Sequence, residues 1–147
     1  AVKDHFISTG ISAYFANTYM HKGGRDFDVY GSICLNSEYG FNLHAVDTAI
    51  KFGAKQVFLP TVSSRSHKAI LASSNKQGGN SHFIPQKVKA MPPEELRCID
   101  ENGALKEEVK AVLRLVKEHD AILQTGHITM TKCWRLRSTV RRLAWKR

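Results

Sequence analysis

The chain has 147 residues, of which 42% are hydrophobic and 24% charged, and its net charge is +9. This length allows one domain with a buried core, and the composition excludes a wholly disordered chain. No apolar run reaches the roughly 18 residues that a membrane-spanning helix needs, so we predict no membrane segment and a cytoplasmic location. The three unevenly spaced cysteines exclude a disulfide framework and favour a reducing compartment.

The positive charge is concentrated near the C-terminal end. Residues 128–147 contain seven Lys or Arg and no acid, so the first 127 residues carry only +2. A basic surface over the whole chain, as nucleic-acid binders often have, is therefore not indicated. We expect a small-molecule substrate, and the pattern indicates no oligomeric state. The alternative is a nucleic-acid-binding module formed by residues 128–147, in which Trp134 and Trp145 would stack on bases.

Short apolar strands and amphipathic helices alternate along the chain. We predict strands over residues 1–6, 29–35, 56–60 and 121–125, and helices over 11–20 and 105–119. A further helix is expected between Asn42, a suitable N-cap, and Gly53. Strand, helix and strand with short connections are typical of a βαβ unit, so the sequence predicts an α/β fold with a parallel sheet.

One segment departs from this alternation. Residues 62–95 are rich in Ser, Lys, Asn, Gly and Pro and are longer than an ordinary connection. We predict a long polar loop there, followed by a short strand over 96–99 and a tight turn at Glu101-Asn102-Gly103.

Five polar side chains lie at or shortly after the ends of predicted strands. Lys3 and His5 end the first strand, Asn36 ends the second, His67 lies beyond the third, and His127 follows the last. The carboxyl ends of parallel strands share one face, so these residues are expected to converge. Imidazoles there could hold zinc, although a single strand-end histidine is more often a hydrogen-bonded or solvent-facing residue than a ligand. Asn36 either orients a substrate or ligand, or caps a turn.

Four motifs, in order along residues 1–129, carry a resemblance. They are Val2-Lys3-Asp4-His5-Phe6, Tyr30-Gly31-Ser32-Ile33-Cys34-Leu35-Asn36, Phe58-Leu59-Pro60-Thr61-Val62-Ser63 with His67, and Ala121-Ile122-Leu123-Gln124-Thr125-Gly126-His127. The set resembles an uncharacterised prokaryotic family of metal-dependent hydrolases within the amidohydrolase superfamily. The resemblance implies a distorted TIM-like barrel and a metal site that uses Lys3 or His5 with His67 and His127. The superfamily's His-x-His pair on the first strand has no counterpart here, and its later strands are absent.

We therefore predict a partial TIM-like (β/α) barrel over residues 1–129, incomplete at both ends, and a metal-dependent hydrolase acting on a C–N or ester-type bond. His5, His67 and His127 would bind a divalent metal, for which we expect zinc, with Lys3 as ligand or charge stabiliser and Asn36 as a polar contact. The alternative is a non-catalytic remnant. Residues 130–147 form a basic tail without a clean apolar stripe, and we hypothesise that this tail is a frameshift product.

Overall fold

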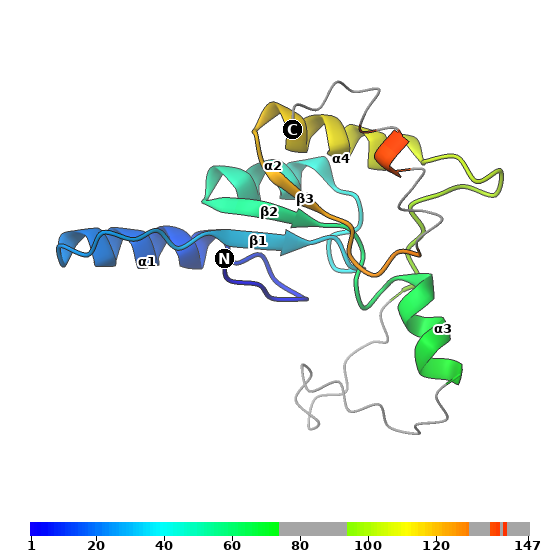
Figure 1. Cartoon of the computed structure of the whole chain (residues 1–147), viewed down its shortest axis with the longest axis horizontal. Coiled ribbons are helices and arrows are strands. Elements are labelled where there is room, and N and C mark those ends of the chain that lie inside the picture. Colours follow the sequence, from blue (N-terminus) through cyan, green and yellow to red (C-terminus); the bar gives the residue numbers. More distant parts are fainter. Residues whose placement is uncertain (74–93, 130–135, 139, 141–147) are drawn as a thin grey trace.

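A parallel three-stranded sheet forms the centre of the fold (Figure 1). The computed structural model describes residues 1–73, 94–129, 136–138 and 140. Its strands are β1 (Gly31–Cys34), β2 (Ala54–Phe58) and β3 (Ile122–Gln124), in the order β1-β2-β3. Phe58 is aligned with Cys34 on one side and with Gln124 on the other, so the three strands end at the same level. The sheet is open over the described residues, and its closure into a barrel stays a prediction.

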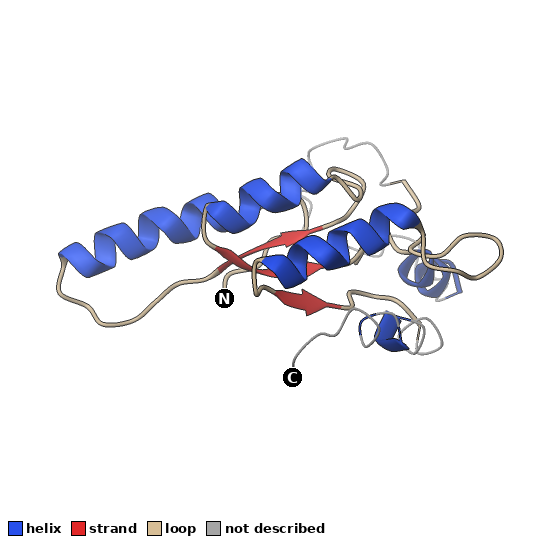
Figure 2. Cartoon of the chain, turned by 90° about the horizontal axis from the view of Figure 1, so that it is seen from above, coloured by secondary structure: helices blue, strands red, loops and turns tan. Residues whose placement is uncertain are grey.

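Two helices, α2 (Leu43–Lys51) and α4 (Glu107–Glu118), contact each other and cover one side of this sheet (Figures 1 and 2). Asn42 is the N-cap of α2, as predicted, because its side-chain oxygen accepts hydrogen bonds from the amides of His44 and Ala45. Helix α4 carries Glu107 and Glu108 in its first turn and Lys117 in its last, which suits the helix dipole.

The core lies between these helices and the sheet. Burial of its aliphatic side chains is the main force that holds the helices in place. Its fully buried members come from the regions of β1 and β2 and from both helices: Ile33, Leu35, Val46, Val57, Leu59, Val109, Val112, Leu113 and Val116.

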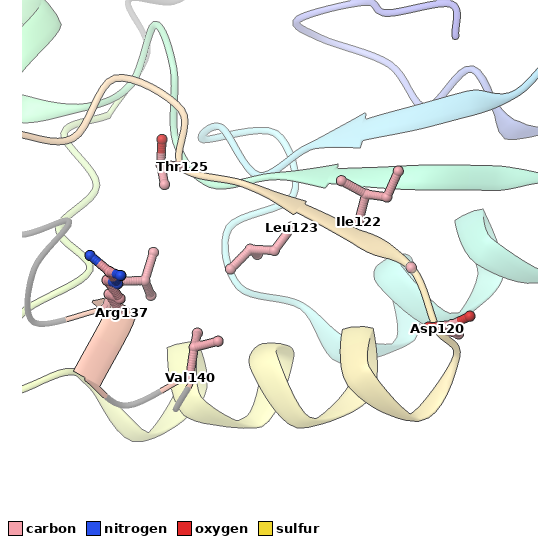
Figure 3. A pocket seen from close by; sticks show the side chains of 8 residues that line it. Asp120, Ile122, Leu123, Thr125, Arg137 and Val140 are labelled. Atoms are coloured by element: carbon pink, nitrogen blue, oxygen red, sulfur yellow. The ribbon is translucent and has the colours of Figure 1, made fainter. Parts of the chain in front are cut away.

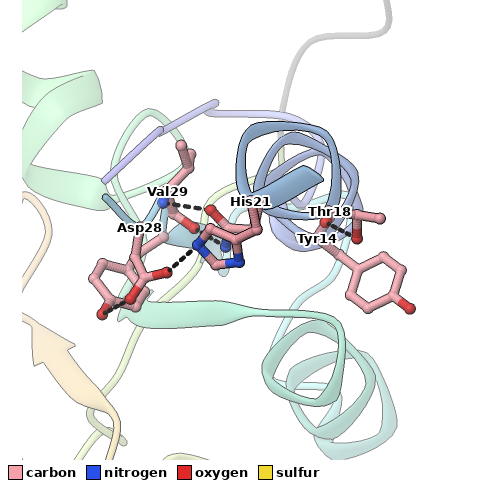
Figure 4. Close-up of polar contacts among 7 residues, drawn as sticks. Tyr14, Thr18, His21, Asp28 and Val29 are labelled. Atoms are coloured by element: carbon pink, nitrogen blue, oxygen red, sulfur yellow. Dashed lines mark hydrogen bonds and ion pairs between the residues drawn. The ribbon is translucent and has the colours of Figure 1, made fainter. Parts of the chain in front are cut away.

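Helix α1 (Gly10–Lys22) packs against β1 at its start and extends beyond the sheet (Figure 1). The side chain of Asn17 makes two hydrogen bonds with the backbone of Val29, and Nε2 of His21 lies 3.2 Å from a carboxylate oxygen of Asp28 (Figure 4). These contacts hold the segment between α1 and β1 against the helix. The predicted helix is confirmed, but Tyr14 and Tyr19 are exposed.

Three predicted elements differ from the structure. Residues 1–6 are not a strand: Val2 donates to the carbonyl of Tyr30, but the carboxylate of Asp4 then accepts from the amides of Phe6 and Ile7 and turns the chain. The predicted polar loop contains helix α3 (Arg65–Ser73), which begins after Ser64; the rest of that loop, 74–93, lies outside the described residues. The predicted strand over 96–99 forms only isolated bridges, Ser64 with Leu96 and Ile99 with Leu105.

The predicted tail is not wholly separate from the core. Leu136 is 3% exposed and packs in the core cluster, with Val140 against it. The remaining residues of the tail, including Trp134 and Trp145, lie outside the part of the chain that the structure describes. None of the helices in that part has the length and apolar character to cross a bilayer.

Candidate functional site

The candidate site lies at the carboxyl ends of the three strands. Asn36 follows β1, Thr61 follows β2, and His127 follows β3, while the first residues of the chain approach from the side of β1. The parallel sheet therefore brings together residues that are far apart in the sequence, as the topology leads one to expect.

A buried pair, Asn36 and Thr61, connects the ends of β1 and β2. Both side chains are 0% exposed. The Nδ2 group of Asn36 donates to the carbonyl of His5 at 2.8 Å and to Oγ1 of Thr61 at 2.9 Å. Its Oδ1 atom accepts from the amides of Thr61 at 2.8 Å and Ser63 at 3.2 Å. These bonds occupy both ends of the amide, which favours a turn-fixing role for Asn36 over contact with a substrate.

His5 is held by this pair through its ring. Its Nδ1 atom lies 2.9 Å from Oγ1 of Thr61, within hydrogen-bond distance. The hydroxyl of Thr61 also lies 3.3 Å from Oδ1 of Asn36, but it has a single hydrogen to donate. If that hydrogen goes to Asn36, Nδ1 of His5 carries the ring proton, so Thr61 controls the tautomer of His5.

His67 and His127 form the closest pair of candidate ligands. Their Nδ1 atoms are 3.2 Å apart and their ring centroids 5.0 Å apart. The buried hydroxyl of Ser64 links the two backbones, because it donates to the carbonyl of His127 and accepts from the amide of His67, each at 3.1 Å. His67 lies in the first turn of α3, so the helix that the sequence did not predict positions this ligand.

A glycine lets the strand-end loop of His127 approach that of β2. The amide of His127 donates to the carbonyl of Pro60 at 3.1 Å. Gly126 has a φ of +62°, and a Cβ atom there would overlap the carbonyl oxygens of Leu59 and Pro60. The position therefore requires glycine.

Lys3 lies over the end of β2. Its Nζ atom is 4.3 Å from the centroid of the Phe58 ring, a cation–π contact. Its charge also acts on Cys34 at the end of β1, although burial is the stronger influence there and raises the pKa of that thiol to about 11. Cys34 therefore stays protonated and serves as core packing.

The environment favours neutral imidazoles. Burial lowers the pKa of His5 below its ordinary value, and the charges of Lys3 and His127 lower it further. Burial also lowers the pKa of His127, and His67 and Lys3 add to this effect. Neutral imidazoles have a lone pair for a proton or a metal, so both residues are suited to bind either one near neutral pH.

The donor set fits a metal ion in part. Two nitrogens bound to one tetrahedral zinc at ~2.0–2.1 Å are roughly 3.3 Å apart, close to the observed 3.2 Å between the Nδ1 atoms of His67 and His127. The contact of His5 with Thr61 is of the kind that orients a metal-binding histidine through its other nitrogen. Within the described ranges, however, no three His, Cys, Asp or Glu side chains are already gathered as one metal-binding group.

The sequence prediction placed Lys3, His5, Asn36, His67 and His127 at one edge, and the structure brings their elements together there. It gave no role to Phe58, Thr61, Ser63 or Ser64, which contact the predicted residues. Hydroxyl residues in a Ser-rich segment carry no distinctive pattern. Their one available signal was their place directly after a buried strand.

A separate pocket of about 560 Å³ lies along β3 (Figure 3). Ile122, Leu123 and Thr125 of the strand region line it, opposite Leu136 and Val140. None of the predicted site residues contributes to its lining, so we do not assign the chemistry to it.

Comparison with known sequences gives one family. Residues 1–147 match DUF6282, described as a family of unknown function, and the match includes the basic tail. No curated protein and no solved structure matches the chain.

Proposed function

Since this chain belongs to the DUF6282 family, we propose a function from its site: a metal-dependent hydrolase of the amidohydrolase kind that acts on a small molecule. The proposal includes a C–N or ester-type scissile bond and a sheet that is part of a TIM-like barrel. Parallel strands with polar side chains at their carboxyl ends support it, because that is where such barrels build their sites.

The single observation that carries the proposal is the approach of His67 and His127. Their Nδ1 atoms are separated by 3.2 Å, the spacing of two ligands of one zinc ion, and neither ring is paired with a carboxylate by any described ion pair. Contact between two protonated imidazoles would be repulsive, so the pair is suited to share either a proton or a metal ion.

The remaining residues have distinct roles in the proposal. His67 and His127 would hold the ion, and His5, oriented by Thr61, would supply the third imidazole. When bound, a divalent metal activates water and polarises the substrate oxygen. Lys3 would stabilise negative charge beside the ion, and Asn36 would keep the backbone of His5 and Thr61 in place.

Zinc titration of the full chain by calorimetry tests this function. We expect one zinc ion per chain, with binding reduced at least about tenfold by either His67→Ala or His127→Ala, since each removes a ligand. His44→Ala is the matched control, because the His44 side chain is exposed on α2. The hydrogen bond of His44 with Asn42 uses its backbone amide, which the substitution keeps.

The same proteins would then be assayed with small amides and esters. Zinc-dependent hydrolysis that disappears in both variants and persists in His44→Ala supports the proposal. A wild-type chain that binds no stoichiometric zinc refutes it and favours the non-catalytic remnant.

A further inference from the structure

We infer that the substrate carries an anionic oxygen group, a carboxylate or phosphate, and that Lys3 binds this group. The inference rests on the proposed function and extends it to the class of substrate. It is carried by the position of the Lys3 ammonium group and by the balance of charge around it.

The ammonium group of Lys3 lies at the carboxyl end of β2. It lies 4.3 Å from the ring centroid of Phe58, the last residue of β2. Its charge acts on Cys34, the last residue of β1, and on His5 and His127. The Lys3 ammonium group therefore contacts the end of β2, and its charge influences groups at the other strand ends.

The aromatic contact positions this charge without neutralising it. Lys3 is exposed, and it takes part in none of the ion pairs formed by the described residues. A ring face attracts an ammonium group but leaves its N–H donors able to bind an anion. A lysine held in this way over a strand end is suited to bind an incoming oxyanion.

Few charges lie near Lys3, because the lowered pKa values of His5 and His127 favour neutral imidazoles. Asp4 is the one anion among the described groups that act on His5, and none acts on His127. The carboxylate of Asp4 already accepts hydrogen bonds from the amides of Phe6 at 2.7 Å and Ile7 at 2.9 Å. A divalent ion bound by imidazoles would add two further positive charges, so an anionic substrate would complement the site and a cationic one would be repelled.

Titration of the metal-free full chain with inorganic phosphate and with acetate tests the inference, with chemical shifts or heat as the readout. We expect at least one of these anions to bind, and Lys3→Met to weaken its binding about tenfold, the effect of losing one charge-assisted hydrogen bond. Lys3→Arg should retain binding, because it keeps the charge. Preference for phosphate or for acetate would identify the group.

Lys55→Met is the matched control, since Lys55 is exposed on the same strand as Phe58 but near its other end. Lys3→Gln gives a second charge-removing variant, and the melting temperature of each variant reports whether it is folded. Equal anion binding by the wild type, Lys3→Met and Lys3→Gln overturns the inference, as does binding of neither anion by the wild type.

Zinc titration of the same proteins separates the two proposals. If the chain binds zinc but the Lys3 substitutions do not change anion binding, the hydrolase proposal stands and the inference of an anionic substrate is refuted. Lys3-dependent anion binding without zinc binding does the reverse.

Discussion

The region under α2 and α4 and the carboxyl edge of the same sheet are stabilised in different ways. Under the helices, Val109, Val112, Leu113 and Val116 are fully buried against aliphatic side chains of the strands. At the edge, the buried polar residues are Asn36, Thr61, Ser63 and Ser64, and hydrogen bonds connect them. Apolar burial therefore supplies stability, while a satisfied polar network fixes where the polar side chains lie.

The largest effect on stability is expected in the apolar region. Leu113→Ala removes a fully buried side chain from α4 and leaves a cavity, so we expect the free energy of unfolding to fall by about 3 kcal/mol. Urea unfolding measures this change. Arg114→Ala, on the exposed side of the same helix, should change stability by less than ~0.5 kcal/mol. Equal effects of the two variants would contradict the assignment of the core.

At the polar edge, Asn36→Ala leaves the buried amides of Thr61 and Ser63 without their acceptor. We expect a loss of about 2 kcal/mol in urea unfolding, because a buried donor without a partner keeps its desolvation cost. Unlike Leu113→Ala, this variant should also weaken zinc binding, since Asn36 holds the backbone of His5. Asn102→Ala, in an exposed turn, is the control. Unchanged zinc affinity in folded Asn36→Ala would show that the network has no part in positioning the site.

Thr61→Val keeps the shape of the side chain and removes the hydroxyl that contacts His5. We expect the free energy of unfolding to fall by about 1 kcal/mol, because the change deletes the hydrogen bonds that the hydroxyl makes with His5 and with the buried Asn36. Nitrogen-15 chemical shifts of the His5 ring should change with its tautomer. Thr48→Val, at an exposed position of α2, should alter neither quantity. An unchanged His5 tautomer in Thr61→Val would contradict the positioning role.

The smallest expected effect is on the pH dependence of stability. The pKa values of His5 and His127 are lower in the folded chain than the value of about 6.5 that a histidine has in the unfolded chain. Just below pH 6.5 the unfolded chain therefore binds more protons than the folded chain. The free energy of unfolding should therefore fall as the pH is lowered through about 6.5. Lys3→Met removes a cation that lowers both pKa values, so it should reduce this fall, whereas Lys55→Met should not. A steeper fall in Lys3→Met would place Lys3 elsewhere.

The difference between the two regions also explains which predictions from the sequence were confirmed. Helix α4 has an apolar stripe at helical spacing, and the core depends on that stripe, so its residues were recognisable. The Asn42 cap was recognisable for the same local reason. Strand β1 is buried throughout and lies in a nearly continuous apolar stretch, and all three strands were found within a few residues of their bounds.

The polar edge was predictable in its residues more than in its contacts. Histidines after strands indicated where to look, but the partner of His5 is Thr61, 56 positions away, and no local pattern marks that pairing. The short turn made by Asp4 and the helix that begins after Ser64 depend on side-chain to backbone bonds within a polar segment, which periodicity does not detect.

The most direct test of the proposed metal pair is a crystal of the full chain soaked with zinc, with anomalous scattering measured at the zinc edge. We expect an anomalous peak within bonding distance of the Nδ1 atoms of both His67 and His127. This peak should be absent from crystals of His127→Ala. A chain that takes up zinc at other residues, or shows no peak at all, would contradict this expectation.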